Sequence, residues 1–211
     1  MNQNEPVQDI IILVADKNME FAIKGLLTRE QSLKIRPINY QIYVHPDRDP
    51  GCYRMAHQFL KPFSNSFDYA LVLFDRDGCG NHNKSRGQIE SEVNKRLAHN
   101  GWNNRAATIV LDPELEIWVW SDSAEVVRIL GWNGRNPNLK QWLRNNGLWN
   151  VNDPKPTDPK QAMEAALKKV NKPRSSAVFR ELAKKVSLRR CTDPSFTHFC
   201  DCLRNWFPQN L

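Results

Sequence analysis

Two aspartates, Asp75 and Asp77, follow directly on an uninterrupted apolar run at residues 69–74. A continuous apolar run of this length, ended by a turn signal, is typical of a strand buried on both faces of a parallel sheet. If the chain stays extended beyond it, the two side chains leave on the same side and can share one hard cation, Mg²⁺ or Mn²⁺. Turn chemistry offers an alternative, in which Asp77-Gly78 is only a turn and Asp75 caps the next helix.

A second group of acids follows another apolar run, at residues 108–111. Pro113 suits the first position of a helix, with Asp112 as its cap. On such a helix Glu116 lies beside tryptophans, where a carboxylate can serve as a metal ligand or as a general acid or base. For Glu114 the favoured interpretation is plainer: it complements the dipole at the helix N-terminus, and the tryptophans are core residues.

Further polar candidates lie in two loops. His45, Asp47 and Asp49 belong to a polar segment that would lie near the same sheet edge if the strands are parallel. Turn chemistry favours a plain loop there, with Asp49-Pro50 opening the next helix. Residues 78–82 contain two glycines, which would suit backbone approach to a phosphate and would equally suit a flexible loop.

The elements that must position these side chains alternate along the first 112 residues. Apolar or alternating runs predict four strands, at residues 10–14, 36–44, 69–74 and 108–111. Apolar residues at helical spacing predict three helices between them, at residues 18–28, 49–60 and 85–98. Connections of this length allow parallel pairing with helices on both faces, so the predicted fold class is α/β, a parallel sheet flanked by helices. Neither a G-x-G-x-x-G nor a Walker sequence is present, which disfavours a nucleotide cofactor.

The basic charge is concentrated near the C-terminus. Residues 1–150 carry 18 basic and 17 acidic residues, and residues 151–211 carry 12 and 6, so +6 of the net +7 lies in the last segment. Residues 151–160, with three prolines, are typical of a linker. The chain therefore divides into an α/β core (1–122), a helical, Trp-rich continuation of that core (123–150) and a basic helical extension (151–211). The extension either contacts a polyanion or presents solvated basic helix faces.

The composition is typical of a folded protein and also bears on the cellular compartment in which the protein is expected. Hydrophobic residues make up 40% and charged residues 25%, ordinary values for a globular protein. No apolar run approaches the ~20 residues that span a bilayer, and the first residues lack the basic region of a signal peptide. Five cysteines, an odd number, fit reduced thiols, and Cys200 with Cys202 near His198 lack a second ligand pair for zinc. We expect a cytoplasmic protein with no membrane partner.

Three segments in order resemble the motifs of Toprim-like proteins. They are LVADKNMEFAIKGLL at residues 13–27, ALVLFDRDGCG at residues 70–80 and DPELEIWVW at residues 112–120. In that family a strand ends in an acid before a helix, a second strand ends in D-x-D, and a later acid completes the site. The third motif is similar to the P-x-x-E-x-W of small RloB-like proteins. Nearly the whole chain also resembles a component of bacterial methylation-associated defence systems.

The resemblance implies a divalent-metal site that acts on nucleic-acid phosphodiesters. By position, Asp16 corresponds to the family's first acid and Glu20 to its second, while Asp75 and Asp77 correspond to the D-x-D. These side chains would bind Mg²⁺ or Mn²⁺, and Asp16 with Glu116 would complete the metal shell or move a proton. The implied protein is a metal-dependent nuclease of antiphage defence, with nucleic acid and other defence-system proteins as partners.

One position departs from the family pattern. The family has a glutamate followed by glycine where this chain has Asp16 followed by Lys17. Aspartate is one methylene shorter, and Lys17 could hold a phosphate or occupy the place of the metal. The departure favours an alternative function, a non-catalytic Toprim-like module that binds nucleic acid or partner subunits. The expected nucleic-acid contacts are the basic side chains of Lys17, Lys168, Lys169, Lys172, Arg174, Lys184, Lys185, Arg189 and Arg190.

Overall fold

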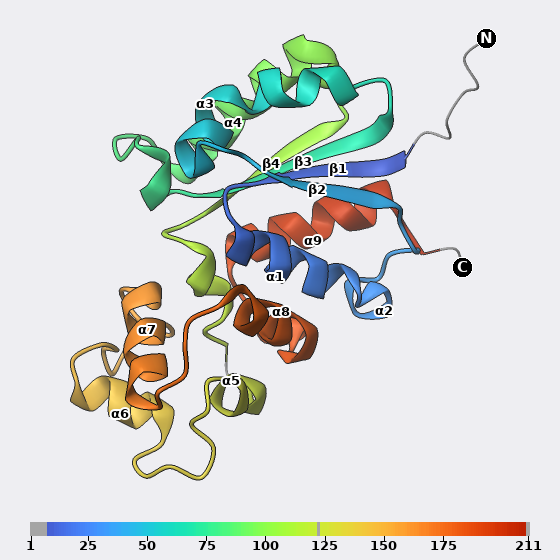
Figure 1. The fold of residues 1–211 in the computed structure, drawn as a ribbon. Coiled ribbons are helices and arrows are strands. Elements are labelled where there is room, and N and C mark those ends of the chain that lie inside the picture. Colours follow the sequence, from blue (N-terminus) through green and yellow to red (C-terminus); the bar gives the residue numbers. More distant parts are fainter. Residues whose placement is uncertain (1–7, 122, 210–211) are drawn as a thin grey trace.

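A parallel β-sheet forms the centre of the protein. The computed structural model describes residues 8–121 and 123–209. Figure 1 shows a four-stranded sheet with strand order β2-β1-β3-β4, all pairs parallel, and helices on both faces. The strands are β1 (Gln8–Val14), β2 (Tyr40–Val44), β3 (Phe67–Asp75) and β4 (Ala106–Leu111). The predicted α/β class, with a parallel sheet flanked by helices, is confirmed.

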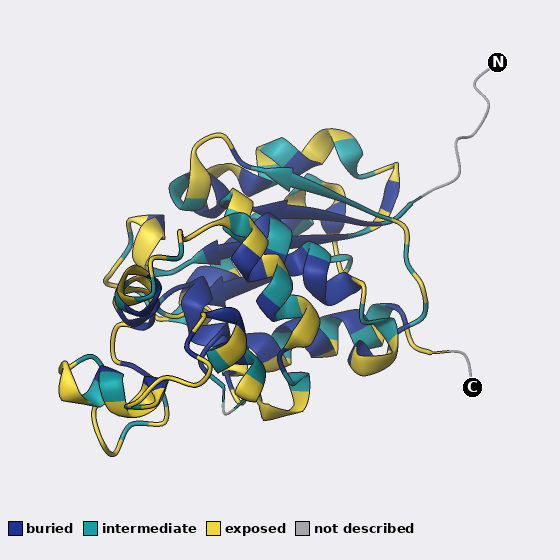
Figure 2. Cartoon of the chain, turned by 60° about the horizontal axis from the view of Figure 1, so that its bottom comes forward, coloured by how far each residue is buried: buried dark blue, intermediate teal, exposed yellow. Residues whose placement is uncertain are grey.

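Continuous apolar sequence accounts for the two central strands. Residues 10–14 of β1 and 70–74 of β3 are completely buried, whereas every residue of β2 is only half-buried, as expected of an edge strand. Figure 2 shows these buried strands beneath helices whose outer surfaces are exposed. The register pairs Val14 with Val44 on one side and with Leu73 on the other, so the carboxyl ends of the strands meet at one edge of the sheet.

Helices from the first half of the chain cover both faces of the sheet. α3 (Arg48–Leu60) and α4 (Arg86–Leu97) lie on one face. α1 (Lys17–Leu27) lies on the other face and is followed by the short α2 (Glu30–Leu33). A capping box at Ser85 fixes the start of α4, because its side chain accepts the hydrogen bond of the third helical N–H.

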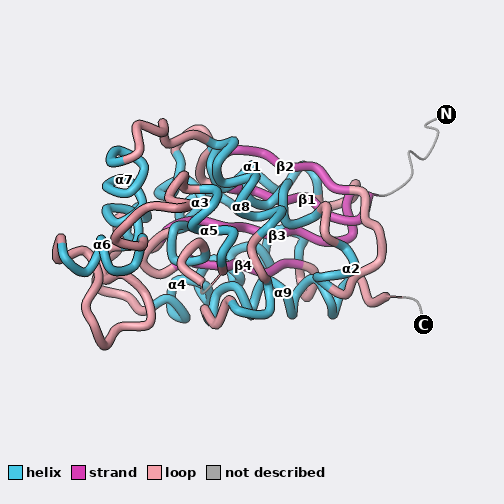
Figure 3. Tube along the Cα trace, turned by 90° about the horizontal axis from the view of Figure 1, so that it is seen from below, coloured by secondary structure: helices cyan, strands magenta, loops and turns pink. Residues whose placement is uncertain are grey.

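The C-terminal segment completes the second face. α8 (Ser176–Lys185) packs along α1, and α9 (Pro194–Trp206) packs against β4 on the same side of the sheet (Figures 1 and 3). Phe199 of α9 and Phe207 beyond it are fully buried. α9, which belongs to the segment expected as a basic extension, is therefore part of the covering of the sheet, and α8 from the same segment covers α1.

Three further helices lie away from the sheet: α5 (Ala124–Ile129), α6 (Leu139–Asn145) and α7 (Pro159–Lys169). α6 and α7 lie past the carboxyl ends of the strands, whereas α5 packs against α8 (Figures 1 and 3). Trp120 joins this region to the core, because its indole N–H donates to the Pro159 carbonyl oxygen at 2.8 Å and its ring contacts Trp149. Within the described ranges, none of the helices combines the length and the apolar character needed to cross a bilayer.

The chain does not stay extended beyond β3, so that prediction is wrong. Arg76 already has helical backbone angles (φ −62°, ψ −46°), and a 3-10 turn spans Asp77–Cys79. Asp75 and Asp77 therefore do not leave the backbone as alternate residues of one strand. The turn interpretation holds for Asp77, because the chain bends as soon as the buried strand ends.

The helix predicted from Pro113 is also wrong. Glu114 has an extended backbone, and only a 3-10 turn, Leu115–Trp118, follows it. All four residues of this turn are buried, so the segment has no solvent-facing side. Trp118 packs edge-on against Phe196 of α9, with ring centroids 5.1 Å apart. Packing on all sides overrides the local helix signal at this position.

Candidate carboxylate site at the carboxyl ends of the strands

Asp75, the last residue of β3, lies among four other carboxyl groups. Its Oδ1 atom is buried and has no hydrogen-bond partner within residues 8–121 and 123–209. Burial raises the pKa of Asp75 well above its ordinary value, and the charges of Asp49, Glu116, Asp16 and Glu114 raise it further. A buried carboxyl with an unused acceptor and several like charges around it is an unfavourable arrangement unless something positive compensates it.

Asp49 comes closest to Asp75 through the backbone. The Asp75 N–H donates to Asp49 Oδ1 at 2.8 Å. Burial raises the pKa of Asp49, and that hydrogen bond opposes the effect. The following loop closes tightly over Asp49, since a Cβ atom on Gly78 would lie 2.5 Å from Asp49 Oδ2, so glycine is required there. Asp49 was expected to be a loop residue. The sequence signal that could have identified Asp49 as a site residue was its position just past a strand and in the first turn of a helix.

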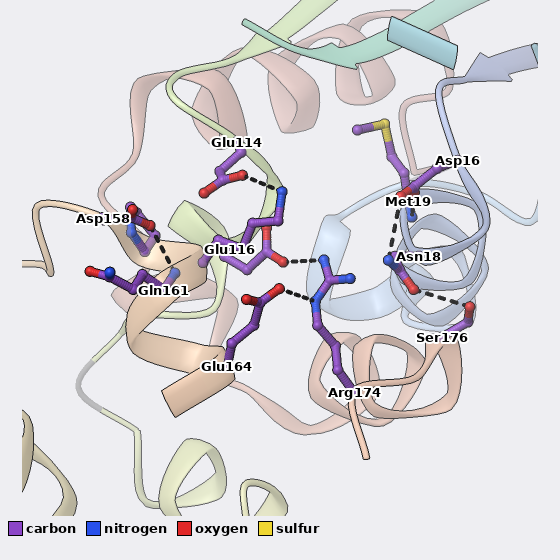
Figure 4. Close-up of polar contacts among 12 residues, drawn as sticks. Asp16, Asn18, Met19, Glu114, Glu116, Asp158, Gln161, Glu164, Arg174 and Ser176 are labelled. Carbon is purple, nitrogen blue, oxygen red and sulfur yellow. Dashed lines mark hydrogen bonds and ion pairs between the residues drawn. The ribbon is translucent and has the colours of Figure 1, made fainter. Parts of the chain in front are cut away.

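Asp16 has a structural role at the same edge of the sheet. It is the N-cap of α1, and its Oδ1 accepts the Met19 N–H at 2.8 Å (Figure 4). The Asn18 side-chain amide donates to the other oxygen at 3.3 Å. Both oxygens of the predicted first acid therefore already have local hydrogen bonds. The negative charge of Asp16 is nevertheless one of those that raise the pKa of Asp75.

A guanidinium group neutralises the far side of the cluster. Arg174 Nη2 lies 2.5 Å from Glu116 Oε1, and its Nε lies 3.8 Å from Glu164 (Figure 4). The Glu116 side chain is 2% exposed and the Arg174 side chain 30%. Burial lowers the pKa of Arg174, but the hydrogen bond to Glu116 raises it by more, so this pKa lies above its ordinary value. Arg174, which is also expected to contact nucleic acid, binds an acid of the candidate site.

A second cation comes from α7. Lys160 Nζ donates to Glu114 Oε2 at 3.1 Å. Burial raises the pKa of Glu114, whereas the hydrogen bond from Lys160 lowers it. The side chain of Glu114 thus has a partner from 46 residues away in the sequence rather than a helix dipole of its own. Lys160 and Arg174 together bring two positive charges from the C-terminal segment to this edge.

Three other predicted site residues lie outside this cluster. Glu20 is buried on α1, where its carboxylate is bound by Lys17 at 2.8 Å and by Lys24 at 2.6 Å. Lys17 keeps a side chain that is 70% exposed. Asp77 is exposed on its turn. Lys17 therefore does not occupy the place of a metal, and the cations that bind acids of the cluster are Arg174 and Lys160.

The remaining basic candidates are spread over the ends of α7 and α8. The Lys172 ammonium donates to the Ile129 carbonyl oxygen at 2.5 Å, so its head group has a structural contact. The others are exposed: Lys168, Lys169, Lys184, Lys185, Arg189 and Arg190. Exposed lysines and arginines at helix ends can contact a polyanion, and equally can remain solvated.

The donor chemistry of the cluster suits Mg²⁺ or Mn²⁺, which prefer carboxylate oxygens. The unused acceptor on Asp75 Oδ1 fits such a cation. No three Asp, Glu, His or Cys side chains in the described part of the chain are arranged so that they could hold a metal ion together. Four of the five carboxyl groups already have partners: Asp16 caps α1, Asp49 accepts the Asp75 N–H, Glu114 accepts from Lys160, and Glu116 binds Arg174. The cluster therefore contains oxygen atoms that could bind a divalent cation, but Glu116 is already neutralised by its salt bridge to Arg174.

Comparison of the chain with protein-family models, with curated proteins and with solved structures finds no match. The resemblance to Toprim-like and RloB-like proteins therefore stays a prediction from the sequence motifs. The site itself consists of five carboxyl groups and two cations that bind two of them, and among the described residues the buried Asp75 Oδ1 has no hydrogen-bond partner.

Proposed function

We propose that this chain is a divalent-cation-dependent component of bacterial antiphage defence that acts on nucleic-acid phosphodiesters in the cytoplasm. Asp75, Asp49 and Glu116, with Asp16 beside them, would hold Mg²⁺ or Mn²⁺. One observation carries the proposal: the buried Asp75 Oδ1 has no hydrogen-bond partner among the described residues and lies among four further carboxyl groups. The order of the three acidic motifs and the parallel α/β sheet support a Toprim-like assignment.

Electrostatics gives the physical reason for a cation at this edge. Burial and then the neighbouring acids raise the pKa of Asp75, so the cluster opposes its own ionisation. A divalent cation would remove that penalty and, when bound, would offset the charge that develops on a scissile phosphate. Asp16, held by the Met19 N–H, provides a carboxylate whose position is fixed by the start of α1.

Arg174 would then have two alternative partners. Its guanidinium must leave Glu116 before that carboxylate can serve as a ligand. Guanidinium groups bind phosphate through two parallel hydrogen bonds at least as well as they bind carboxylate. We therefore propose that Arg174 exchanges Glu116 for a substrate phosphate, which would couple cation binding to substrate binding.

Calorimetric titration with Mg²⁺ and with Mn²⁺ tests the proposal. The wild-type protein is expected to bind one of these cations, and both Asp75→Ala and Asp49→Ala are expected to abolish binding, because each removes an oxygen donor from the cluster. Asp77→Ala is the matched control: it removes an exposed aspartate two residues away and should leave the titration unchanged. An unchanged circular dichroism spectrum verifies folding of each variant. A folded wild-type protein that binds neither cation would rule out the stand-alone enzyme.

The alternative function is a non-catalytic module that binds nucleic acid or partner subunits. The observation that favours it is the 2.5 Å salt bridge between Arg174 and Glu116, which fills the cluster with a cation of the protein's own. In that case nucleic-acid binding needs no divalent cation, and Asp75→Ala leaves it intact. A binding assay with and without a chelator separates the two functions.

Glutamine in place of both Lys184 and Lys185 is expected to weaken binding to duplex DNA and to flatten its salt dependence. Each lost phosphate contact lowers the slope of log K against log salt by ~0.9, so the double variant should lose up to about 1.8. Fluorescence anisotropy over a salt series measures this slope. Lys61→Gln, an exposed lysine next to α3 on the opposite face, is the control. Equal slopes for all three proteins would show that the end of α8 does not contact the nucleic acid.

A further inference from the structure

A pocket lies outside the sheet, between the segment that ends at Trp120 and the helices α5 and α6 (Figure 1). Its volume is about 110 Å³, whereas a single water molecule needs only ~10–15 Å³. Most of its lining is apolar and includes Trp120, Trp149, Val126, Val127 and Leu139. Ser121 and Lys140 are among its few polar residues. Apolar and aromatic walls with a few polar groups are typical of sites for small ligands.

Two tryptophan rings form a rigid part of this pocket. The rings of Trp120 and Trp149 meet edge to face, with centroids 5.6 Å apart and planes at 74°. The Trp120 indole N–H donates to the Pro159 carbonyl oxygen at 2.8 Å, and the Trp149 indole N–H donates to the Asp153 carbonyl oxygen at 2.9 Å. Both rings are therefore held in place and offer a ligand aromatic surface alone. Such a surface suits a flat ring.

The hydroxyl group of Ser121 lacks a partner. Its Oγ is buried and has no hydrogen-bond partner within residues 8–121 and 123–209. A buried polar atom in this state costs free energy, and a bound water or ligand commonly accounts for it. Because a hydroxyl group both donates and accepts, either kind of polar atom on a ligand would satisfy it. The ring that enters this pocket should therefore carry polar atoms on its edge.

A lysine adds a positive charge to the same pocket. Lys140 is exposed, and its Nζ lies 4.9 Å from the centroid of the Trp149 ring. An ammonium group in this position can bind an anion that is attached to the ring on the tryptophans. The ligand therefore combines a flat ring, polar atoms on its edge and an anionic group. A nucleotide, with its base and its phosphate, has all three.

The pocket adjoins the carboxylate site along the chain and through α7. Trp120 follows Glu116 by four residues, and the whole of this segment is buried. Pro159 accepts the Trp120 indole N–H, and the next residue, Lys160, binds Glu114 of the carboxylate cluster. A strand with one base in the pocket would therefore continue towards the edge of the sheet where the cation is proposed to bind.

We propose that this pocket binds one unstacked base of a single-stranded nucleic acid. The ring would lie against Trp120 and Trp149, its edge would form a hydrogen bond with Ser121, and its phosphate would contact Lys140. The proposal rests on the nucleic-acid part of the proposed function and names single strands as the substrate class. Bases of a duplex are paired and stacked, so they cannot enter the pocket. A free nucleotide lacks the neighbouring phosphates of a strand and should bind more weakly.

Fluorescence anisotropy with a labelled eight-nucleotide oligothymidylate, in the presence of EDTA, tests this proposal on the full chain. Val127→Phe puts a larger side chain into the pocket and should weaken binding of the strand about tenfold, the loss of one stacked base, while binding of duplex DNA stays unchanged. Lys140→Gln should weaken binding several-fold and reduce the slope of log K against log salt by ~0.7. Arg135→Gln is the matched control, because the exposed Arg135 guanidinium lies 5.7 Å from the ring of Trp132, outside the pocket.

Ser121→Ala separates a role in binding from a role in folding. It removes the unpartnered hydroxyl group, so the unfolding temperature of the free protein should not fall. Binding of the strand should nevertheless weaken about fivefold, because one hydrogen bond to the base is lost. A side chain with a purely structural role would not weaken binding in a protein of undiminished stability. Unchanged binding by Ser121→Ala would overturn the assignment of this hydroxyl group to the base.

Three results would overturn the proposal as a whole. They are no binding of the strand in EDTA, equal weakening of strand and duplex by Val127→Phe, and binding of free thymidine monophosphate as tight as that of the strand. The calorimetric titration with Mg²⁺ and Mn²⁺ tests the carboxylate site separately, because EDTA removes divalent cations from the anisotropy assay. Failure of the pocket and failure of the proposed cation site are therefore distinguishable. Circular dichroism verifies that each variant is folded.

Discussion

Asparagine in place of Asp75 is expected to raise the free energy of unfolding of the cation-free protein by about 1–3 kcal/mol at neutral pH, because the neutral amide carries no penalty for ionisation among the neighbouring acids. The pKa of Asp75 lies above its unfolded value of 3.8, because of burial and of four neighbouring acids. The folded state therefore binds the proton more tightly, and ionisation costs stability as the pH rises from about 4 through the folded pKa. The gain should thus be large at about pH 8 and vanish near pH 4. Urea unfolding over this pH range measures it.

The same substitution should abolish cation binding, so stability and function would move in opposite directions, as is common at functional sites. Asp77→Asn is the control, since it neutralises an exposed aspartate of the same motif. Its free energy of unfolding should change by less than about 0.5 kcal/mol at every pH. A destabilised Asp75→Asn protein would contradict this picture and would mean that the Asp75 carboxylate is ionised and favourably paired in the folded state.

Removal of Arg174 is expected to have the second large effect. Arg174→Ala leaves Glu116, whose side chain is 2% exposed, without its guanidinium partner. Breaking a fully buried pair costs about 3–5 kcal/mol, and solvent reaches the 30% exposed Arg174 side chain, so we expect a loss of about 2–3 kcal/mol. Mg²⁺ or Mn²⁺ should restore part of that loss, because a cation at Glu116 replaces the missing charge. Thermal unfolding with and without the cation measures both effects.

Glu164→Gln provides the comparison for Arg174→Ala. It removes the other partner of the guanidinium, at 3.8 Å and with a side chain that is 50% exposed, so its cost should stay below about 0.5 kcal/mol. Cation affinity should rise in Arg174→Ala and stay unchanged in Glu164→Gln. If Arg174→Ala binds the cation no better than the wild type, Arg174 does not compete for the site.

The sheet could be predicted from the sequence because each strand carries its own signal. The continuous apolar runs at residues 69–74 and 108–111 lie within β3 and β4, and the run at 10–14 lies within β1. Burial on both faces demands apolar residues at every position, so the pattern is local and strong. The alternating segment at residues 36–44 contains β2, which forms only at Tyr40–Val44. Its weaker pattern reflects an edge position with one face in water.

The site was harder to predict, because its contacts join distant segments. Asp75 at a strand end was expected, since its run of apolar neighbours marks the end of β3. Asp49 was a candidate near the same edge, but the turn chemistry of its segment favoured a plain loop over a site residue. Arg174 was expected at nucleic acid because of its basic neighbours, yet it binds Glu116 from 58 residues away. No local periodicity encodes such a pairing.

The order of these residues along the chain has a consequence for biosynthesis. All five carboxyl groups of the cluster precede residue 117, whereas their counter-charges are at Lys160 and Arg174. During synthesis, all the acidic residues of this edge and the apolar strand that α9 covers therefore leave the ribosome before Lys160, Arg174 and α9 do. A chain that stops near residue 150 would hold uncompensated negative charge beside an uncovered apolar face. Such a product should be captured by chaperones and degraded, so that only chains translated through α9 accumulate.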